Sequence, residues 1–251
     1  MAEAQDDGVF IYMGGDQVVP DDVVRVRIDK SVTIIPPQAF FRRRHLIYVE
    51  FHDLIERIER FAFNGCFLLR GVKSLGIKVI KLGAFSDCIG LTEVEFGDKL
   101  EQIGGGAFQR CTSLRSITMP SVTIIGHGAF SNCEMLTDLD LPEGLETIQE
   151  HAFLCCQRLK RFAIPLKDDL IEGNVFDNCP NLTAVDLVGG IHNTVASLHL
   201  EEWRNEMRGE INRINQALPP TPMHEARPQR YENGSDQSSA VSIITKLNTD
   251  H

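Results

Sequence analysis

The 251-residue chain is long enough for one or two domains with a sizeable core, and its 43% hydrophobic and 24% charged residues are ordinary for a globular protein. Its net charge of −10 argues against nucleic acid or an anionic membrane as the main partner, because both require a cationic surface. No apolar run is long enough to span a bilayer, and the acidic N-terminus lacks the apolar segment of a secretory signal, so we expect a cytoplasmic protein.

Residues 1–30 are predicted to form an N-terminal cap. Val24, Val26 and Ile28 alternate with polar residues, which indicates a strand with one buried face. Charge beside this strand comes from Asp21, Asp22, Arg25 and Arg27. The first strand edge of a stack of repeats is exposed and requires such protection.

An octet of the form Ala-Phe-x-x-Cys-x-x-Leu recurs along the middle of the chain. The first copy has Arg43 in place of Cys, and the last two copies are weaker. The Phe residues, separated by 22 or 23 positions, are Phe40, Phe63, Phe85, Phe108, Phe130, Phe153 and Phe176. Such a fixed period predicts a repeat solenoid over residues 31–190.

Each octet leads into alternating apolar residues, as at 91–96 and 136–141, which predicts a strand with one buried face. A second short extended piece follows, such as 145–148, and a turn returns the chain to the next octet. One coil should therefore contain a strand, a turn, an extended segment, and a short helix or helical turn that carries Phe and Cys. Stacked coils should pair their strands in parallel and align the Phe side chains as an interior column.

These features resemble the BspA-like leucine-rich repeats. The resemblance is carried by Leu-x-x-Ile/Val/Leu-x-Leu/Phe/Met-Pro, then Leu-x-x-Ile, then the octet, over about residues 24–190. It implies an α/β repeat solenoid, a right-handed leucine-rich-repeat superhelix with parallel strands and coils of 22–23 residues, to which the sequence adds a C-terminal helix beyond the repeats. The stretch 10–20 is also similar to the start of repeat proteins from diatoms, which implies no activity. Bacterial members of the wider family include surface adhesins, and we expect this chain to differ from them because its N-terminal residues do not resemble an export signal.

Residues 191–218 are predicted to form an amphipathic helix, because apolar residues from Leu200 to Leu218 recur at spacings of three and four. This helix either caps the last coil or offers residues 195–218 to a partner helix, and Trp203 on the apolar stripe fits both roles. Residues 219–251 are rich in Pro, Asn and Ser and are predicted to be a disordered tail. The small apolar cluster of Val241, Ile243, Ile244 and Leu247 could dock elsewhere on the protein, but we expect it to have no structural role.

Seven Cys lie in the repeats. Six share one octet position, namely Cys66, Cys88, Cys111, Cys133, Cys156 and Cys179, and the seventh is Cys155. One Cys per coil and an odd total predict buried thiols in a reducing compartment. Zinc and a catalytic Cys are the alternatives, but a ladder of sulfurs is not tetrahedral and no base is placed beside a sulfur. We therefore expect no metal, no cofactor and no catalytic residue.

Other motifs are weak. The eight His form no HxxxH or HExxH motif and are predicted to be surface or turn residues. The glycines at 104–106 and 126–128 are predicted to form turns, because no Lys-Ser/Thr follows to complete a phosphate loop. Arg42, Arg43 and Arg44 form either a solvated turn or a contact with an anion or partner.

The strand residues that alternate with the core should form one open face. The predicted protein-binding residues on it are Tyr48, Glu50, Glu93, Glu95, Asp138, Asp140, Arg161 and Asp186. The face is completed by Gly71, Lys73, Ser116, Thr118, Ala163 and Ala184, which gives six acidic residues against two basic ones. These carboxylates either favour a basic protein partner, with Glu93, Glu95, Asp138 and Asp140 as the patch, or only solubilise the sheet.

The sequence thus predicts a non-enzymatic scaffold that binds a protein partner through an acidic strand face. One alternative is a cell-surface or secreted adhesin. Another is an enzyme that uses paired carboxylates for glycoside cleavage. The enzyme is disfavoured because the acids lie on an open sheet, without a cleft that excludes water.

Overall fold

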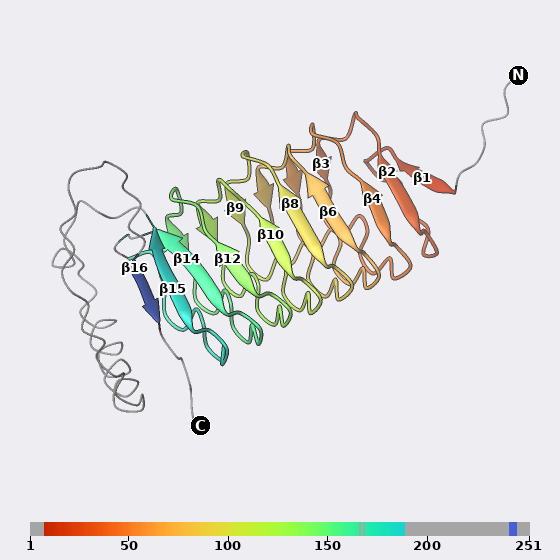
Figure 1. Ribbon diagram of the computed structural model, residues 1–251. Helices are drawn as coiled ribbons and strands as arrows, with labels where there is room; N and C mark the ends of the chain where they lie inside the picture. Colours follow the sequence, from red (N-terminus) through yellow and green to blue (C-terminus); the bar gives the residue numbers. More distant parts are fainter. Residues whose placement is uncertain (1–7, 166, 168, 189–240, 245–251) are drawn as a thin grey trace, which may run out of the picture.

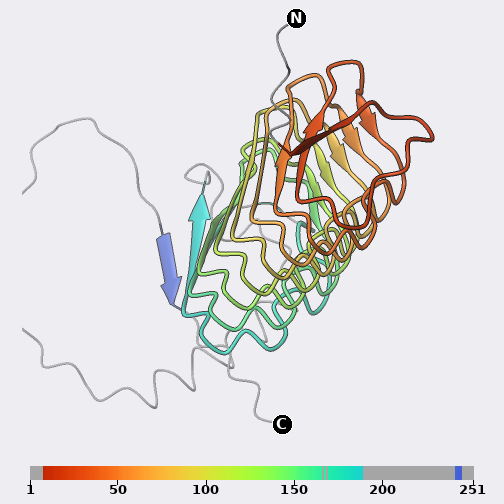
Figure 2. The ribbon, with the colours of Figure 1, turned by 90° about the vertical axis from the view of Figure 1, so that its right-hand side faces the viewer.

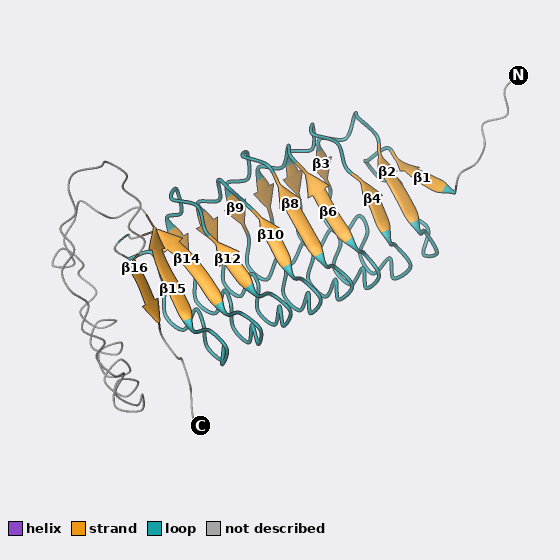
Figure 3. Cartoon of the chain, viewed as in Figure 1, coloured by secondary structure: helices purple, strands orange, loops and turns teal. Residues whose placement is uncertain are grey.

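Short strands joined by turns recur once per repeat and stack in a row (Figure 1). The computed structural model describes residues 8–165, 167, 169–188 and 241–244. Within these residues it contains strands and turns but no helix (Figure 3), so this part is a β-solenoid and not the expected α/β solenoid. Accordingly, no helix with the length and apolarity of a bilayer span occurs in the described part of the chain.

The alternating segments form one strand per coil along the face seen in Figure 1. They are β1 (Val9–Tyr12), β2 (Arg25–Ile28), β4 (Tyr48–Glu50), β6 (Gly71–Ser74), β8 (Glu93–Phe96), β10 (Ser116–Thr118), β12 (Asp138–Asp140), β14 (Arg161–Pro165) and β15 (Ala184–Val188). Neighbours pair in parallel as β1–β2–β4, β6–β8–β10 and β12–β14–β15. In β8, Val94 and Phe96 are buried while Glu93 and Glu95 are exposed, which confirms the period-two pattern.

The second extended pieces form a separate parallel sheet. Its strands, in order, are β3 (Ile34–Ile35), β5 (Arg57–Ile58), β7 (Val79–Ile80), β9 (Gln102–Ile103), β11 (Ile124–Ile125) and β13 (Thr147–Ile148). The second residue of every strand is buried, and a bridge from Ile148 to Ile171 continues the ladder. Each coil thus points one Ile from this sheet into the core.

The segment that carries Phe and Cys forms consecutive tight turns, so of the two predicted alternatives the helical turn fits and the short helix does not. The Cys66 N–H donates to the Phe63 carbonyl at 3.2 Å, and the Leu69 N–H donates to the Cys66 carbonyl at 3.2 Å. Two positions per coil, two residues before and two after the Phe, have φ between 55° and 74°: Gln38, Phe61, Gly83, Gly106, Gly128, His151 and Asn174, then Arg42, Gly65, Asp87, Arg110, Asn132, Cys155 and Asn178. Left-handed residues at this spacing interrupt a right-handed helix. Gly106 and Gly128 confirm the predicted turn glycines.

The predicted Phe column is confirmed. Six successive ring pairs from Phe40 to Phe176 are stacked, with centroids 4.7–5.7 Å apart and planes within 11° of parallel. Figure 2, turned by 90°, shows the coils one behind another. The rings from Phe40 to Phe153 are fully buried, while Phe176 is half-buried. The stacked Leu column on the same core is also fully buried: Leu46, Leu69, Leu91, Leu114, Leu136, Leu159 and Leu182.

The two ends of the described chain depart from the predictions in detail. At the N-terminal end, Val26 and Ile28 are buried in β2 as expected, but Val24 is exposed and lies outside the strand. Near the C-terminal end, β16 (Val241–Ile244) pairs antiparallel with β15, so these four residues of the predicted disordered tail form a strand. The helix predicted over 191–218, the helix-mediated contact through 195–218 and the rest of the 219–251 tail lie outside the described residues.

Candidate functional site

The parallel strands place the predicted binding residues on one face. Exposed side chains are those of Tyr48, Glu50, Glu93, Glu95, Asp138 and Asp140, and half-buried ones are those of Arg161 and Asp186. The ladder sets Glu93 beside Gly71 and Ser116, and it sets Asp138 beside Arg161. The strand β10 lies between β8 and β12 in Figure 1, so Glu93 and Asp138 are two strands apart.

Ion pairs neutralise much of this face. The pairs are Arg27–Glu50 (2.8 Å), Lys73–Glu95 (2.8 Å), Arg161–Asp140 (2.6 Å) and Arg161–Asp186 (2.6 Å). Four of the six predicted carboxylates are therefore paired with a cation on a neighbouring strand. Within the described residues, only Glu93 and Asp138 among these six make no ion pair. The carboxylates among these six that remain available to a partner without breaking an ion pair are therefore those of Glu93 and Asp138.

The predicted ratio of six acids to two bases was too acidic. Arg25 and Arg27 of β2, which the sequence analysis assigned to a cap, pair in register with Tyr48 and Glu50 of β4. Both arginine side chains are exposed on the same side of the ladder. The face therefore carries four bases, because the N-terminal strand continues the sheet instead of only covering its edge.

Ala163, predicted to face outward, is buried with 3% exposure. It lies in the ladder between Asp140 and Asp186, the two residues that the Arg161 guanidinium bridges. The guanidinium therefore bridges the two residues that flank Ala163 in the ladder. Hydrogen bonds to Asp140 and Asp186 also raise the pKa of Arg161, so its charge is permanent.

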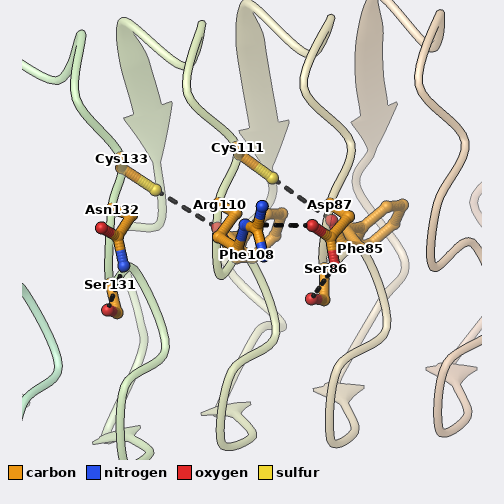
Figure 4. Close-up of polar contacts among 9 residues, drawn as sticks. All are labelled: Phe85, Ser86, Asp87, Phe108, Arg110, Cys111, Ser131, Asn132 and Cys133. Carbon is orange, nitrogen blue, oxygen red and sulfur yellow. Dashed lines mark hydrogen bonds and ion pairs between the residues drawn. The ribbon is translucent and has the colours of Figure 1, made fainter.

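The octet cysteines are structural thiols, as predicted. Each thiol donates to the carbonyl oxygen of the Phe one coil earlier, at 3.1–3.3 Å; Figure 4 shows Cys111 with Phe85 and Cys133 with Phe108. Burial raises the pKa of the Cys66 thiol from 9.0 to about 12, and it also raises the pKa of Cys88, Cys111 and Cys133. Neutral, hydrogen-bonded sulfurs of this kind are poor nucleophiles and poor metal ligands. The seventh, Cys155, is half-buried at a left-handed turn position.

The three successive arginines are engaged with their own chain. Arg43 pairs with Asp21 at 2.7 Å. The Arg42 guanidinium lies over the Phe41 ring and that of Arg44 over the Phe67 ring, at 5.0 and 5.3 Å from the centroids. These contacts favour an internal role over a contact with an anion or partner.

The turns on both sides of Phe108, Phe130 and Phe153, together with Leu82 of the preceding coil, form a depression of about 300 Å³. It is lined by Leu82, Gly105, Gly106, Gln109, His127, Gly128, Ser131, His151 and Leu154. Two of these lining residues, His127 and His151, and Glu150 each offer a ligand atom, and these three atoms lie within 4.8 Å of one another. Within the described residues, this is the group of His, Cys, Asp or Glu side chains that lie close enough together to hold a metal ion.

No motif of residues close together in the sequence points to this cluster, so it was not predicted. The cluster becomes apparent only when equivalent positions of successive coils are compared. His127 and Glu150 each precede the Phe of their coil by three residues, and His151 precedes its Phe by two. Stacked coils bring such equivalent positions side by side, although they are 23 or 24 residues apart in sequence.

Comparison with known proteins identifies the fold family. The model described as "BspA type Leucine rich repeat region" matches with six copies, over residues 22–120 and 72–183. Comparison with the curated proteins found no match.

Several solved structures are similar. A leucine rich cell surface protein from Faecalibacterium prausnitzii A2-165 is 24% identical with a TM-score of 0.46, over 68% of this chain and 61% of that chain. A leucine-rich repeat protein from Bacteroides ovatus ATCC 8483 is 23% identical with a TM-score of 0.46, over 66% and 55% of the two chains. The T. pallidum leucine rich repeat protein is 21% identical with a TM-score of 0.45, over 82% and 90%. The chain spans less than two thirds of the length of the first two structures. The family match covers more than half of the sequence, and the chain belongs to the BspA-type leucine-rich repeat family.

Proposed function

We propose that the protein is a non-enzymatic scaffold that binds a protein partner with a basic surface through its strand face. The observation that carries this proposal is the pair of exposed, unpaired carboxylates of Glu93 and Asp138 on an open parallel ladder. Two strand spacings separate them, about 10 Å. This distance is comparable to the Debye length at physiological salt, so both charges act on one cationic patch of a partner.

The other predicted residues have a secondary role in this proposal. Engaging Glu50, Glu95, Asp140 or Asp186 requires displacement of an existing ion pair with Arg27, Lys73 or Arg161. Tyr48, with 54% exposure, offers an aromatic surface on the same face. The proposed binding patch is therefore narrower than the four-residue acidic patch predicted from sequence.

The chemistry of the described side chains supports binding over catalysis. The carboxylates lie on an open strand face, where water has free access to any reacting group. Burial raises the pKa of the Cys66, Cys88, Cys111 and Cys133 thiols, so these four stay neutral and are poor nucleophiles. The net negative charge also favours a protein partner over nucleic acid or an anionic membrane.

The proposed location is the cytoplasm. The free, buried thiols support a reducing compartment. The alternative, a cell-surface or secreted adhesin, predicts recovery of the protein in the surface or medium fraction of the source cell. Our proposal predicts recovery in the cytosolic fraction, and fractionation with immunodetection separates the two.

Charge reversal tests the binding patch. Affinity capture from the source cell compares the wild-type chain with the double variant Glu93→Lys/Asp138→Lys. The matched control is Asp98→Lys/Glu143→Lys, which makes the same change in net charge at exposed residues outside the strands. A true partner is retained by the wild type and the control, and its recovery falls at least about tenfold with the patch variant, as expected for close charge pairs.

Equal recovery by the patch variant and the control would contradict the proposal, provided that far-UV circular dichroism shows both variants folded. Loss of the partner from the control variant as well would show that only net charge matters. That result would also contradict a specific patch.

A further inference from the structure

The turns before Phe130 and Phe153 bring together three side chains that commonly bind metals. The ligand atoms of His127, Glu150 and His151 all lie within 4.8 Å of one another. The two imidazole rings meet edge to face with centroids 5.5 Å apart, and Glu150 Oε1 lies 3.8 Å from His151 Nδ1. We propose that these three side chains bind a first-row transition-metal dication, with Zn²⁺ as the probe.

The donor set fits this class of metal. Zn²⁺ binds His nitrogen and Glu oxygen at about 2.0–2.2 Å, which places the ligand atoms of a tetrahedral site about 3.3 Å apart. The side chains of His127 and Glu150 are exposed. Rotation about their side-chain bonds closes the remaining gap of about 1.5 Å without any movement of the core, since staggered rotamers of exposed residues interconvert freely.

The backbone beneath the cluster is held in place by its neighbours. The Gly128 N–H donates to the Glu150 carbonyl at 3.1 Å, which joins the two coils at the site. The His127 N–H donates to Gln149 Oε1 at 3.0 Å, and the Glu150 N–H donates to Glu172 Oε2 at 3.3 Å. Metal binding therefore requires ordering of side chains only, which keeps its entropic cost small.

The surroundings leave room for a fourth ligand. Gly105 and Gly173 occupy the positions equivalent to His127 in the coils on either side of the cluster, so neither contributes a side chain there. His127 and His151 line the 300 Å³ depression together with the apolar side chains of Leu82 and Leu154. Three protein ligands with one open position are typical of zinc sites that exchange a water molecule or an external donor.

Metal titration of the full-length protein tests the site. Because the chain has eight His and seven Cys, the site is identified by difference, in a Cys155→Ser background that removes the half-buried thiol. Zn²⁺ affinity is measured by calorimetry, and Co²⁺ binding is followed by its visible spectrum. The variants are His127→Ala, Glu150→Gln and His151→Asn. Asn suits the left-handed backbone there, since Asn174 holds the equivalent position at φ 55°. The matched control is His45→Ala, which removes another exposed His.

The site predicts one Zn²⁺ binding event whose affinity falls at least about tenfold in His127→Ala and in His151→Asn, since even the loss of an outer partner costs that much at metal sites. Combining the two substitutions adds little, because the site is already lost. The His45→Ala variant binds as the background does, and Co²⁺ gives the intense visible bands of four-coordinate nitrogen and oxygen ligation.

Three results would overturn the proposal. The first is affinity in folded His127→Ala and His151→Asn variants within twofold of the background. The second is an equal loss of affinity in His45→Ala. The third is a sulfur-to-cobalt charge-transfer band, which would place the metal on thiols. Because the strand face is on other residues, failure here leaves the proposed scaffold function untouched.

Discussion

Replacing Phe108 with Ala removes one ring from the middle of the aromatic column. Phe108 has 0% exposure and stacks between Phe85 and Phe130, with both centroid distances 5.3 Å, and it also meets Phe96 at 6.2 Å. Truncation of a buried Phe to Ala costs about 3–5 kcal/mol, and each lost aromatic pair contributes about 0.5–1.5 kcal/mol beyond area burial. The coils on both sides are held by backbone ladders and collapse only slightly. We therefore expect a loss of about 4–5 kcal/mol in the free energy of unfolding.

Urea unfolding followed by far-UV circular dichroism measures this loss, with Phe176→Ala as the matched control. Phe176 is half-buried, stacks on Phe153 alone within the column at 5.7 Å and meets Phe162 edge to face at 4.6 Å, so its truncation should cost less than that of Phe108. A loss below about 1.5 kcal/mol for Phe108→Ala would refute an interior column, because such a value is typical of partly exposed sites. Equal losses in the free energy of unfolding for the two variants would contradict the expectation that a Phe in the middle of the stack stabilises the fold more than the Phe at its end.

Two other features of the coils lead to predictions. Gly83→Ala places a methyl group in steric conflict with the Phe61 ring at a φ of +60°, so we expect a loss of stability of about 1–3 kcal/mol. Gly144→Ala, which meets no atom within 4 Å, should be nearly neutral in the same urea assay, and equal effects would contradict the turn geometry. The Cys66 thiol has its pKa raised from 9.0 to about 12 by burial, so the unfolded chain ionises first and stability falls as pH rises through this window. The fall in the urea midpoint should be smaller in Cys66→Ser, which still offers a hydroxyl donor to the Phe40 carbonyl; an identical pH dependence would contradict a buried neutral thiol.

The core could be predicted from sequence, because the repeat period of 22 or 23 residues determines which side chains stack on one another. Once Phe85 and Phe108 are recognised as equivalent, stacking requires them to be neighbours, and the same holds for Leu91 with Leu114. The alternation in β8 assigned Glu93 and Glu95 to the outer face for the same reason.

The turn that carries Phe and Cys was predicted less well. Arg110 and Asn132 adopt a left-handed backbone without being Gly, so the sequence gives little sign that the helix is interrupted there. Neither the ion pairs on the strand face nor the burial of Ala163 follows from alternation alone. Both depend on which residues of neighbouring coils meet, such as Arg161 with Asp140 and Asp186.

The proposed metal cluster was missed for a related reason. His127 and His151 are separated by a whole coil, so a motif search does not pair them. An alignment of the coils on their Phe residues would have set His127 beside Glu150 and one residue from His151. In repeat proteins, candidate sites are found between equivalent positions of successive coils more readily than along the chain.

Ring-to-ring nuclear Overhauser effects in a protein labelled only at Phe test most directly whether equivalent residues of successive coils stack in register. Single Phe→Leu substitutions assign the signals. Register stacking predicts cross-peaks between Phe85 and Phe108 and between Phe108 and Phe130, whose centroids are 5.3 Å apart, and none between Phe85 and Phe130. Absence of the two neighbouring cross-peaks, or a direct one between Phe85 and Phe130, would contradict the stacked coils and with them both proposed sites.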